Sequence, residues 1–234
     1  MKILVINPGS TSTKIAVYEN DTPRLVRNIR HTVDELSSFS HIIDQFEFRK
    51  NLVLKELEAD NIPFEFDAIV GRGGLLKPIP GGVYEVNDAM LDDILHAMRT
   101  HACNLGCLIA SELAALLPGC RAFIADPGVV DELDEIARIT GSPLMPRITI
   151  WHALNQRAIA RRYAAAQHVR YEDLDLIVCH LGGGISVSVH HHGKAVDVNN
   201  ALDGEGPFSP ERAGTLPAGQ LIDLCCSGRY KRRT

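Results

Sequence analysis

Small polar residues and one lysine are concentrated in residues 7–14 of this chain. The apolar segment 3–6 precedes them and the alternating segment 14–18 follows, a pattern that predicts a loop between two strands. A glycine in such a loop allows close backbone approach, hydroxyl groups can bind phosphate oxygens, and a lysine supplies a positive charge. A polar hairpin turn and a phosphate-binding loop are both open interpretations. The residues with this chemistry are Asn7, Ser10, Ser12 and Lys14.

A second loop of the same kind lies near the other end of the chain. The apolar segment 175–179 leads into His180, Gly182, Gly183 and Gly184, and residues 185–189 alternate as a strand does. Three consecutive glycines weaken a sheet unless a ligand or another backbone must come close. A duplicated fold that holds a phosphate chain between its halves explains both loops together.

Three further polar residues stand at the ends of predicted elements. Arg72 follows the buried strand 66–70, Asp126 follows the strand 121–125, and His152 lies at the start of a helix over 151–166. Ligands in open α/β sheets bind outside the carboxyl ends of the strands. A carboxylate there can hold Mg²⁺. The alternatives are a surface arginine, an Asp-Pro-Gly turn and a core histidine.

The elements that must position these residues follow from the hydrophobic pattern. Apolar spacing predicts a long amphipathic helix over 37–58 and two helices over 87–100 and 104–117, with Asn87 and Asn104 as caps. A third N-terminal strand is expected at 24–29, and a return strand at 195–199 after the second loop. Residues 138–150 contain glycine and prolines with little periodicity, which is typical of a crossing between domains.

Composition excludes several function classes. The net charge is −5 and the pI is about 6.0, which gives no electrostatic footprint for nucleic acid. The apolar runs are of strand length, so we expect no membrane segment, and the first residues show no signal peptide. The six cysteines fit no zinc spacing and are expected to be reduced, in a cytoplasmic protein.

Five spaced motifs in order resemble the acetokinase branch of the actin-like ATPase superfamily, and within it the butyrate kinases most closely. The resemblance covers essentially all of residues 1–226. The motifs are residues 7–14, 123–127, 150–156, 179–186 and 203–215.

The resemblance implies an α/β fold with duplicated actin-like (ribonuclease H-like) domains, the second one incomplete. We expect an N-terminal domain over 1–150 with the first phosphate loop, and a partial second domain over 151–234 with the second loop. The implied activity is an acyl kinase that moves the γ-phosphoryl group of ATP reversibly to butyrate or a related short or branched-chain fatty acid. ATP or ADP and Mg²⁺ are the implied cofactors, and a homo-oligomer is implied for a complete chain.

The resemblance also implies roles for single residues. Phosphate or ATP would bind to the four polar residues of the first loop and to His180 with the glycines of the second. The catalytic residues would be Arg72, which binds the carboxyl or phosphoryl group, Asp126, which places Mg²⁺, and His152, which donates to phosphoryl oxygens. An aspartate stands at the position of Asn7 in related sugar and glycerol kinases, which disfavours that alternative.

The sequence departs from the family pattern near its end. Acetate kinases carry an arginine after the Gly-Thr pair of this region, whereas Leu216 follows Thr215 here; Arg212 is the tentative substitute. Family members continue further, so we expect a truncated chain with little kinase activity by itself. The basic residues 229–233 are expected to be a solvated tail. An inactive remnant, or a module that binds phosphate or acyl phosphate, is the alternative function.

Overall fold

The computed structural model describes residues 1–97 and 99–230 of the 234. The chain divides into two compact units, Met1–Val129 and Val130–Thr234, and each is described by itself. This division precedes residue 150 because Val130 and Leu133 pack in one core cluster with Trp151, Ala153, Ala195 and Val198. Residues 138–150, which were expected to connect the two domains, therefore lie within the second unit.

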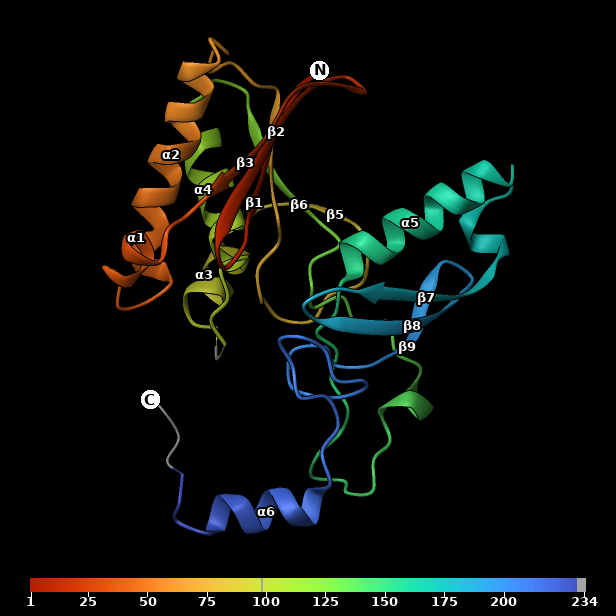
Figure 1. The fold of residues 1–234 in the computed structure, drawn as a ribbon. Helices are drawn as coiled ribbons and strands as arrows, with labels where there is room; N and C mark the ends of the chain where they lie inside the picture. The colour runs from red at the N-terminus through yellow and green to blue at the C-terminus, as the bar shows by residue number, and fades with distance from the viewer. Residues whose placement is uncertain (98, 231–234) are drawn as a thin grey trace. The chain divides into compact units, whose positions relative to one another are not determined.

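The first unit is built on a six-stranded mixed sheet with the order β3-β2-β1-β4-β6-β5. Figure 1 shows this sheet nearly edge-on. The first three strands pair antiparallel, β4 pairs parallel with β1 and with β6, and β5 closes the edge antiparallel to β6. The strands are β1 Lys2–Pro8, β2 Ser12–Glu19, β3 Thr22–Arg30, β4 Ala68–Gly71, β5 Val83–Glu85 and β6 Arg121–Ala125.

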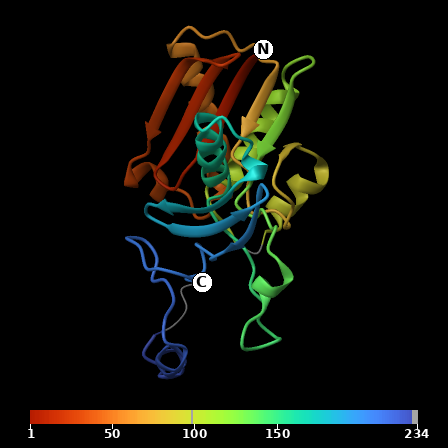
Figure 2. The same ribbon diagram turned by 90° about the vertical axis from the view of Figure 1, so that its right-hand side faces the viewer.

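Two helices pack against this sheet and form the main core. Figure 2 shows the strands side by side with α2 and α4 behind them. Alternating residues of β1 and β2, such as Leu4 and Ile15, are buried against Val53 of α2 and Ile109 of α4. The helical segments of the unit are α1 Val33–Ser37, the 3₁₀ turn Ile43–Gln45, α2 Phe46–Ala59, α3 Asp88–Leu95 and α4 Asn104–Ala115.

Three helix predictions need correction in this unit. The helix expected over 87–100 ends at Leu95. The expected helix over 37–58 begins only at Phe46, because α1 ends at Ser37 and residues 38–42 are not helical. Asn87 caps α3 as expected, with its side chain accepting from Met90 N. Asn104 is not a cap: it is the first residue of α4, and its Oδ1 accepts from Leu75 N at 2.9 Å.

The second unit contains a three-stranded antiparallel sheet of β7 Asp175–Leu181, β8 Ile185–His191 and β9 Lys194–Val198. Helix α5, Ala153–Ala166, lies across this sheet in Figure 1, and its Ala160 and Ala164 pack with Tyr171 and with partly buried residues of β7. Shorter segments are the 3₁₀ turns Glu135–Arg138 and Tyr171–Asp173 and the helix α6 Ala218–Cys226.

The α/β fold with two strand–loop–strand units is confirmed. Both phosphate-type loops join adjacent antiparallel strands, and the two hairpins belong to different sheets. The cysteines are free, and burial raises the pKa of Cys103 to about 11 and that of Cys107 to about 12. Within the described ranges, every helix is too short or too polar to cross a bilayer. The basic tail was expected at 229–233, of which residues 231–233 lie outside the described residues.

Candidate functional site

The first loop is a tight hairpin in the first unit. Residues 9–11 join β1 to β2, and Gly9 N donates to Ser12 O at 2.7 Å. Asn7 pairs with Lys14 across the hairpin, so the amide and the ammonium group stand on neighbouring strands. The side chains of Ser10 and Lys14 are exposed. The four predicted residues therefore lie in or beside one short turn whose polar groups are accessible.

Arg72 lies beside this hairpin, because β4 pairs with β1. Its backbone N donates to Ile6 O at 2.8 Å, and its Nη1 donates to Asn7 Oδ1 at 3.3 Å. A close backbone contact fixes the position: a Cβ on Gly71 would lie 2.1 Å from Gly106 O. The structure thus brings together Asn7 and Arg72, which are 65 residues apart in sequence.

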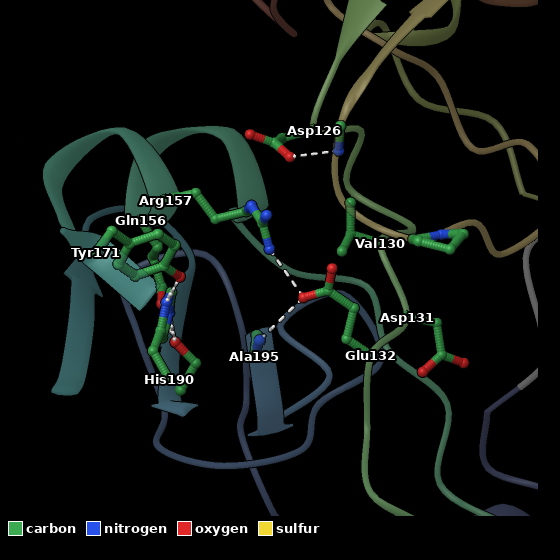
Figure 3. Close-up of polar contacts among 12 residues, drawn as sticks. Asp126, Val130, Asp131, Glu132, Gln156, Arg157, Tyr171, His190 and Ala195 are labelled. Atoms are coloured by element: carbon green, nitrogen blue, oxygen red, sulfur yellow. Dashed lines mark hydrogen bonds and ion pairs between the residues drawn. The ribbon is translucent and has the colours of Figure 1, made fainter. Parts of the chain in front are cut away.

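Asp126 directly follows β6 and has a constrained backbone conformation. Its φ is +37°, in the left-handed region that few non-glycine residues adopt, and it is 5% exposed. Its Oδ1 accepts from Gly82 N at 2.9 Å (Figure 3). Its own N donates to Gly82 O at 2.8 Å. Strained residues of this kind are frequent at functional sites. One fixed carboxylate fits Mg²⁺, which needs few protein ligands when phosphates and waters complete its shell.

The two predicted histidines are in contact in the second unit. His180 is the second-to-last residue of β7, and His152 directly precedes α5. Their rings stack with centroids 3.7 Å apart and planes 7° apart. Asn155 Nδ2 donates to His180 Nδ1 at 2.8 Å, and Ser186 Oγ lies 2.8 Å from His152 Nδ1. Side chains 28 positions apart in the sequence therefore form one surface of two parallel imidazoles.

The triple glycine packs closely against this pair. A Cβ on Gly182 would lie 3.2 Å from His180 Nε2, and one on Gly184 would lie 3.3 Å from His152 Cε1. A Cβ on Gly183 would lie 2.8 Å from the carboxylate of Glu211. Larger residues would displace these side chains, so the fold itself gives one reason for the glycines.

The segment after β9 returns to the same loop. Gly183 O accepts from Glu211 N at 3.1 Å and from Ser209 Oγ at 2.6 Å. Arg212 follows immediately, but its Nη1 donates to Glu211 O at 2.9 Å, and Leu216 is 47% exposed. The catalytic role of Arg212 therefore stays a prediction.

The predicted site residues form two sets, one in each unit. Asn7, Ser10, Ser12, Lys14, Arg72 and Asp126 belong to the first unit, and His152, His180, the three glycines and Arg212 belong to the second. Their assembly in one cleft stays a prediction. Within the described residues there is no group of three His, Cys, Asp or Glu side chains arranged to hold a metal ion.

The sequence is closely similar to named kinases. It is 78% identical over 232 residues to a probable butyrate kinase of Bacteroides thetaiotaomicron, and 55% identical over 231 residues to butyrate kinase 2 of Clostridium acetobutylicum. The chain belongs to the butyrate kinase family. These matches cover 99% and 98% of the chain but 66% and 65% of the two relatives, so the chain spans about two thirds of their length. No protein-family profile matches it.

Solved structures agree with the fold expected for a butyrate kinase relative. The acetate kinase of Porphyromonas gingivalis aligns with a TM-score of 0.66 at 20% identity, covering 98% of the chain and 65% of that structure. A propionate kinase of Francisella tularensis aligns with a TM-score of 0.68 at 16% identity, again covering 98% and 65%. At this identity the likeness concerns the fold alone.

Sequence reasoning missed a buried arginine beneath the first loop of this butyrate kinase relative. Arg49 of α2 is fully buried; its Nη1 donates to Ser12 O at 3.1 Å and to Thr13 Oγ1 at 2.9 Å, and its Nε and Nη2 donate to Gln45 Oε1. Burial lowers the pKa of Arg49 to about 10. The sequence contained one indication that this side chain is buried: Arg49 lies four residues before Val53, so both share the buried face of α2.

Two further arginines of the second unit were also missed. Arg147 donates to Glu205, Asp197 and the carbonyls of Ala137 and Val198, which ties the crossing segment to β9 and the returning loop. Arg157 donates from Nη1 to Glu132 Oε2 at 2.8 Å, and Ala195 N donates to the same oxygen at 3.0 Å (Figure 3). Both arginines join segments that are far apart in sequence, so local patterns do not indicate their partners.

Proposed function

We propose that this chain carries the phosphoryl-handling part of a butyrate kinase-type acyl kinase, acting in the cytoplasm. The reaction is reversible transfer of the γ-phosphoryl group of ATP to butyrate or a related short-chain fatty acid, giving an acyl phosphate and ADP. The observation that carries the proposal is 78% identity to a probable butyrate kinase over 99% of the chain, with both phosphate-type loops retained as hairpins.

The site geometry supports roles that need positioning and charge rather than covalent chemistry. Phosphoryl transfer requires in-line placement and neutralisation of the equatorial oxygens. Lys14 and Arg72 supply positive charge beside the first hairpin, where Asn7 Oδ1 accepts from Arg72. His152 and His180 supply ring N–H donors at the glycine loop of the second unit. These four residues and Asn7 would hold phosphate or carboxylate oxygens.

Asp126 is the residue that would hold the metal. Its carboxylate is held in place by Gly82 N, and one fixed carboxylate suffices for Mg²⁺ when phosphates and waters supply the other ligands. Mg²⁺ bound there would neutralise negative charge on the ATP phosphates. Asp126→Asn would keep the size of the side chain and remove its charge, so the proposal expects a higher Mg²⁺ requirement.

The kinase proposal is tested with a protein of full family length. The part of the Bacteroides thetaiotaomicron relative that this chain does not span would be joined to the chain, and acyl hydroxamate would be measured with ATP, Mg²⁺ and butyrate. We expect turnover in the usual enzyme range of about 1–10³ per second, abolished by Lys14→Ala. No turnover with any short-chain acid, in a folded protein, would overturn the proposal.

The second candidate is binding of phosphate or acyl phosphate without turnover by the 234-residue chain. It is favoured by the fact that the chain spans 66% of its relative, while both loops are present. Calorimetric titration with butyryl phosphate and with inorganic phosphate would measure it. Binding that Arg72→Ala weakens, together with the absence of hydroxamate, supports this function; turnover by the unextended chain would exclude it.

A further inference from the structure

Six polar side chains of the second unit form a continuous line of hydrogen bonds that runs from the buried face of the small sheet to His152. We call this line the buried relay. Its inner end is fully enclosed, since His190 is 0% exposed, and Figure 3 shows His190 beside Gln156 and Tyr171. In order, the relay contains Tyr171, His190, Ser188, Gln156, Ser186 and His152.

Gln156 gives the relay a direction. Its Nε2 lies 2.9 Å from the backbone carbonyl oxygen of Ser186, and a carbonyl oxygen can only accept. The amide NH₂ group must therefore face Ser186, and the amide oxygen must face Ser188. Gln156 is 1% exposed, so it has almost no contact with solvent that would supply another partner. With the amide oriented in this way, the donor of each hydrogen bond on either side of Gln156 is determined.

At the His152 end of the relay, one acceptor remains for the proton of the Ser186 hydroxyl group. Its Oγ accepts from Gln156 Nε2 at 2.7 Å and from the backbone N of His152 at 3.3 Å. Its proton is therefore donated to His152 Nδ1, 2.8 Å away. A ring nitrogen that accepts a hydrogen bond carries no proton, so the neutral ring of His152 carries its proton on Nε2.

At the core end of the relay, the position of the Gln156 amide oxygen determines which groups donate and which accept. Gln156 Oε1 accepts from the hydroxyl group of Ser188. Ser188 Oγ then accepts from His190 Nε2 at 2.6 Å, and His190 Nδ1 accepts from the hydroxyl group of Tyr171. Burial, with a further contribution from Arg157, lowers the pKa of His190 to about 4, which keeps this ring neutral. His190 Nε2 also lies 3.4 Å from Gln156 Oε1, so the same donor position serves both contacts. These hydrogen bonds are mutually consistent in this arrangement, and satisfied networks of this kind are rigid.

The relay orients His152 so that its Nε2–H group faces the triple glycine. A Cβ on Gly184 would lie 3.3 Å from Cε1 and 3.6 Å from Nε2 of His152, so the edge of the ring that carries Nε2 faces this loop. The neighbouring His180 is oriented similarly, since its Nδ1 accepts from Asn155 Nδ2 at 2.8 Å.

We propose that Gln156 is a positioning residue which, acting through Ser186, holds His152 in the neutral Nε2–H tautomer. His152 then presents a hydrogen-bond donor, and not a base, at the glycine loop. The inference rests on the proposed function only in naming a phosphoryl oxygen as the acceptor of this bond. Preorganised donors of this kind stabilise charge that develops during group transfer.

The tautomer can be read directly by nitrogen NMR of the uniformly ¹⁵N-labelled 234-residue chain at mildly alkaline pH. The ring signals of His152 are assigned as those lost in His152→Gln. We expect a pyrrole-type Nε2 and a pyridine-type Nδ1. In Gln156→Glu the carboxylate can only accept, so the Ser186 hydroxyl turns to it and we expect the proton of His152 to move to Nδ1. In Ser186→Ala we expect the Nδ1 signal to shift downfield as it loses its donor.

Ser188→Ala is the matched control, because it removes a hydroxyl group from the same strand on the far side of Gln156. We expect it to leave the His152 signals unchanged, and dispersed amide signals confirm that each variant is folded. A proton on Nδ1 in the unsubstituted chain overturns the proposal. So do unchanged His152 signals in folded Ser186→Ala. The readout needs no catalysis, so failure of the kinase assay and failure of this inference are distinguishable.

Discussion

At the scale of single residues, buried polar side chains outside the candidate site are fixed by hydrogen bonds, as the site residues are. Arg49 donates to residues of the first hairpin, and His190 belongs to the buried relay that leads to His152. Both are fully buried, and burial shifts the pKa of each toward the neutral form, to about 10 for Arg49 and about 4 for His190. Polar groups taken out of water in this way are costly unless each is fully hydrogen-bonded.

Replacing Arg49 by alanine is expected to destabilise the chain by about 2–4 kcal/mol. The substitution opens a cavity and leaves Gln45 Oε1 without the donors it now has. The free energy of unfolding would be measured by urea denaturation. Arg24→Ala is the control, since the pair of Arg24 with Glu19 is exposed and should contribute less than about 1 kcal/mol. Equal effects of the two substitutions would contradict this account.

His190 is expected to make stability depend on pH between about 4 and 6.5. Its folded pKa is lowered from 6.5 to about 4, so the unfolded chain binds more protons in this window and stability falls as the pH is lowered. The full contribution is about 3–4 kcal/mol, from roughly 1.4 kcal/mol per pKa unit. Urea denaturation over this range should show a flatter dependence of stability on pH for His190→Gln. His41→Gln is the control, because this side chain is exposed, and it should give the same profile as the unsubstituted chain.

At the scale of elements, close backbone contacts place the ends of the strands that carry site residues. The end of β4 meets the first turn of α4 at Gly71 and Gly106, where a Cβ on Gly106 would lie 2.4 Å from Arg72 O. This contact fixes the backbone of Arg72 beside β1, whose Asn7 accepts from its side chain. The two glycines therefore position the arginine without touching a ligand.

Gly71→Ala is expected to cost at least about 2 kcal/mol of stability, because its methyl group would overlap the carbonyl oxygen of Gly106. The same variant should weaken binding of butyryl phosphate, since relief of the overlap moves Arg72. Thermal unfolding and calorimetric titration would measure the two effects. Gly141→Ala is the matched control, because a Cβ there meets nothing within 4 Å. A Gly71→Ala protein as stable as this control would show that the contact is not required.

At the scale of the whole molecule, the described part of the chain leaves several apolar side chains in solvent. On β7, Ile177 and Leu181 are each 74% exposed, and on α6 Ile222 is 60% exposed. β7 is also an edge strand of its sheet. The chain spans 66% of the length of its relative from Bacteroides thetaiotaomicron. Exposed apolar groups beside an open strand edge favour association with other chains.

We therefore expect the 234-residue chain to bind a fluorescent apolar dye and to self-associate as its concentration rises. The double substitution Ile177→Thr and Leu181→Thr keeps strand-forming residues and removes apolar surface, so it should reduce both effects. Light scattering and dye fluorescence would measure them. Ile139→Thr, at a position 72% exposed and outside any strand, is the control. A chain that stays monomeric and dye-free would refute this prediction.

The sequence by itself determined the two hairpin loops, the α/β class and the described strands other than β5, Val83–Glu85, which no local pattern indicated. Alternation and turn residues act over a few positions, and β1, β2, β7 and β8 lie where these local patterns indicated. It also located Arg72, Asp126 and His152 at the ends of elements, although their shared catalytic site stays a prediction. The long helix over 37–58 was wrong because serine-rich residues 38–42 satisfy helical spacing without forming a helix.

Only the tertiary structure decided which side chains meet. Asn7 contacts Arg72 because β1 and β4 are neighbours in the sheet, and His152 stacks on His180 because α5 begins beside the end of β7. The burial of Arg49 and the direction of the relay at Gln156 also depend on partners 30 or more residues away. Such contacts arise when the packing of whole elements closes long loops, which no local periodicity encodes.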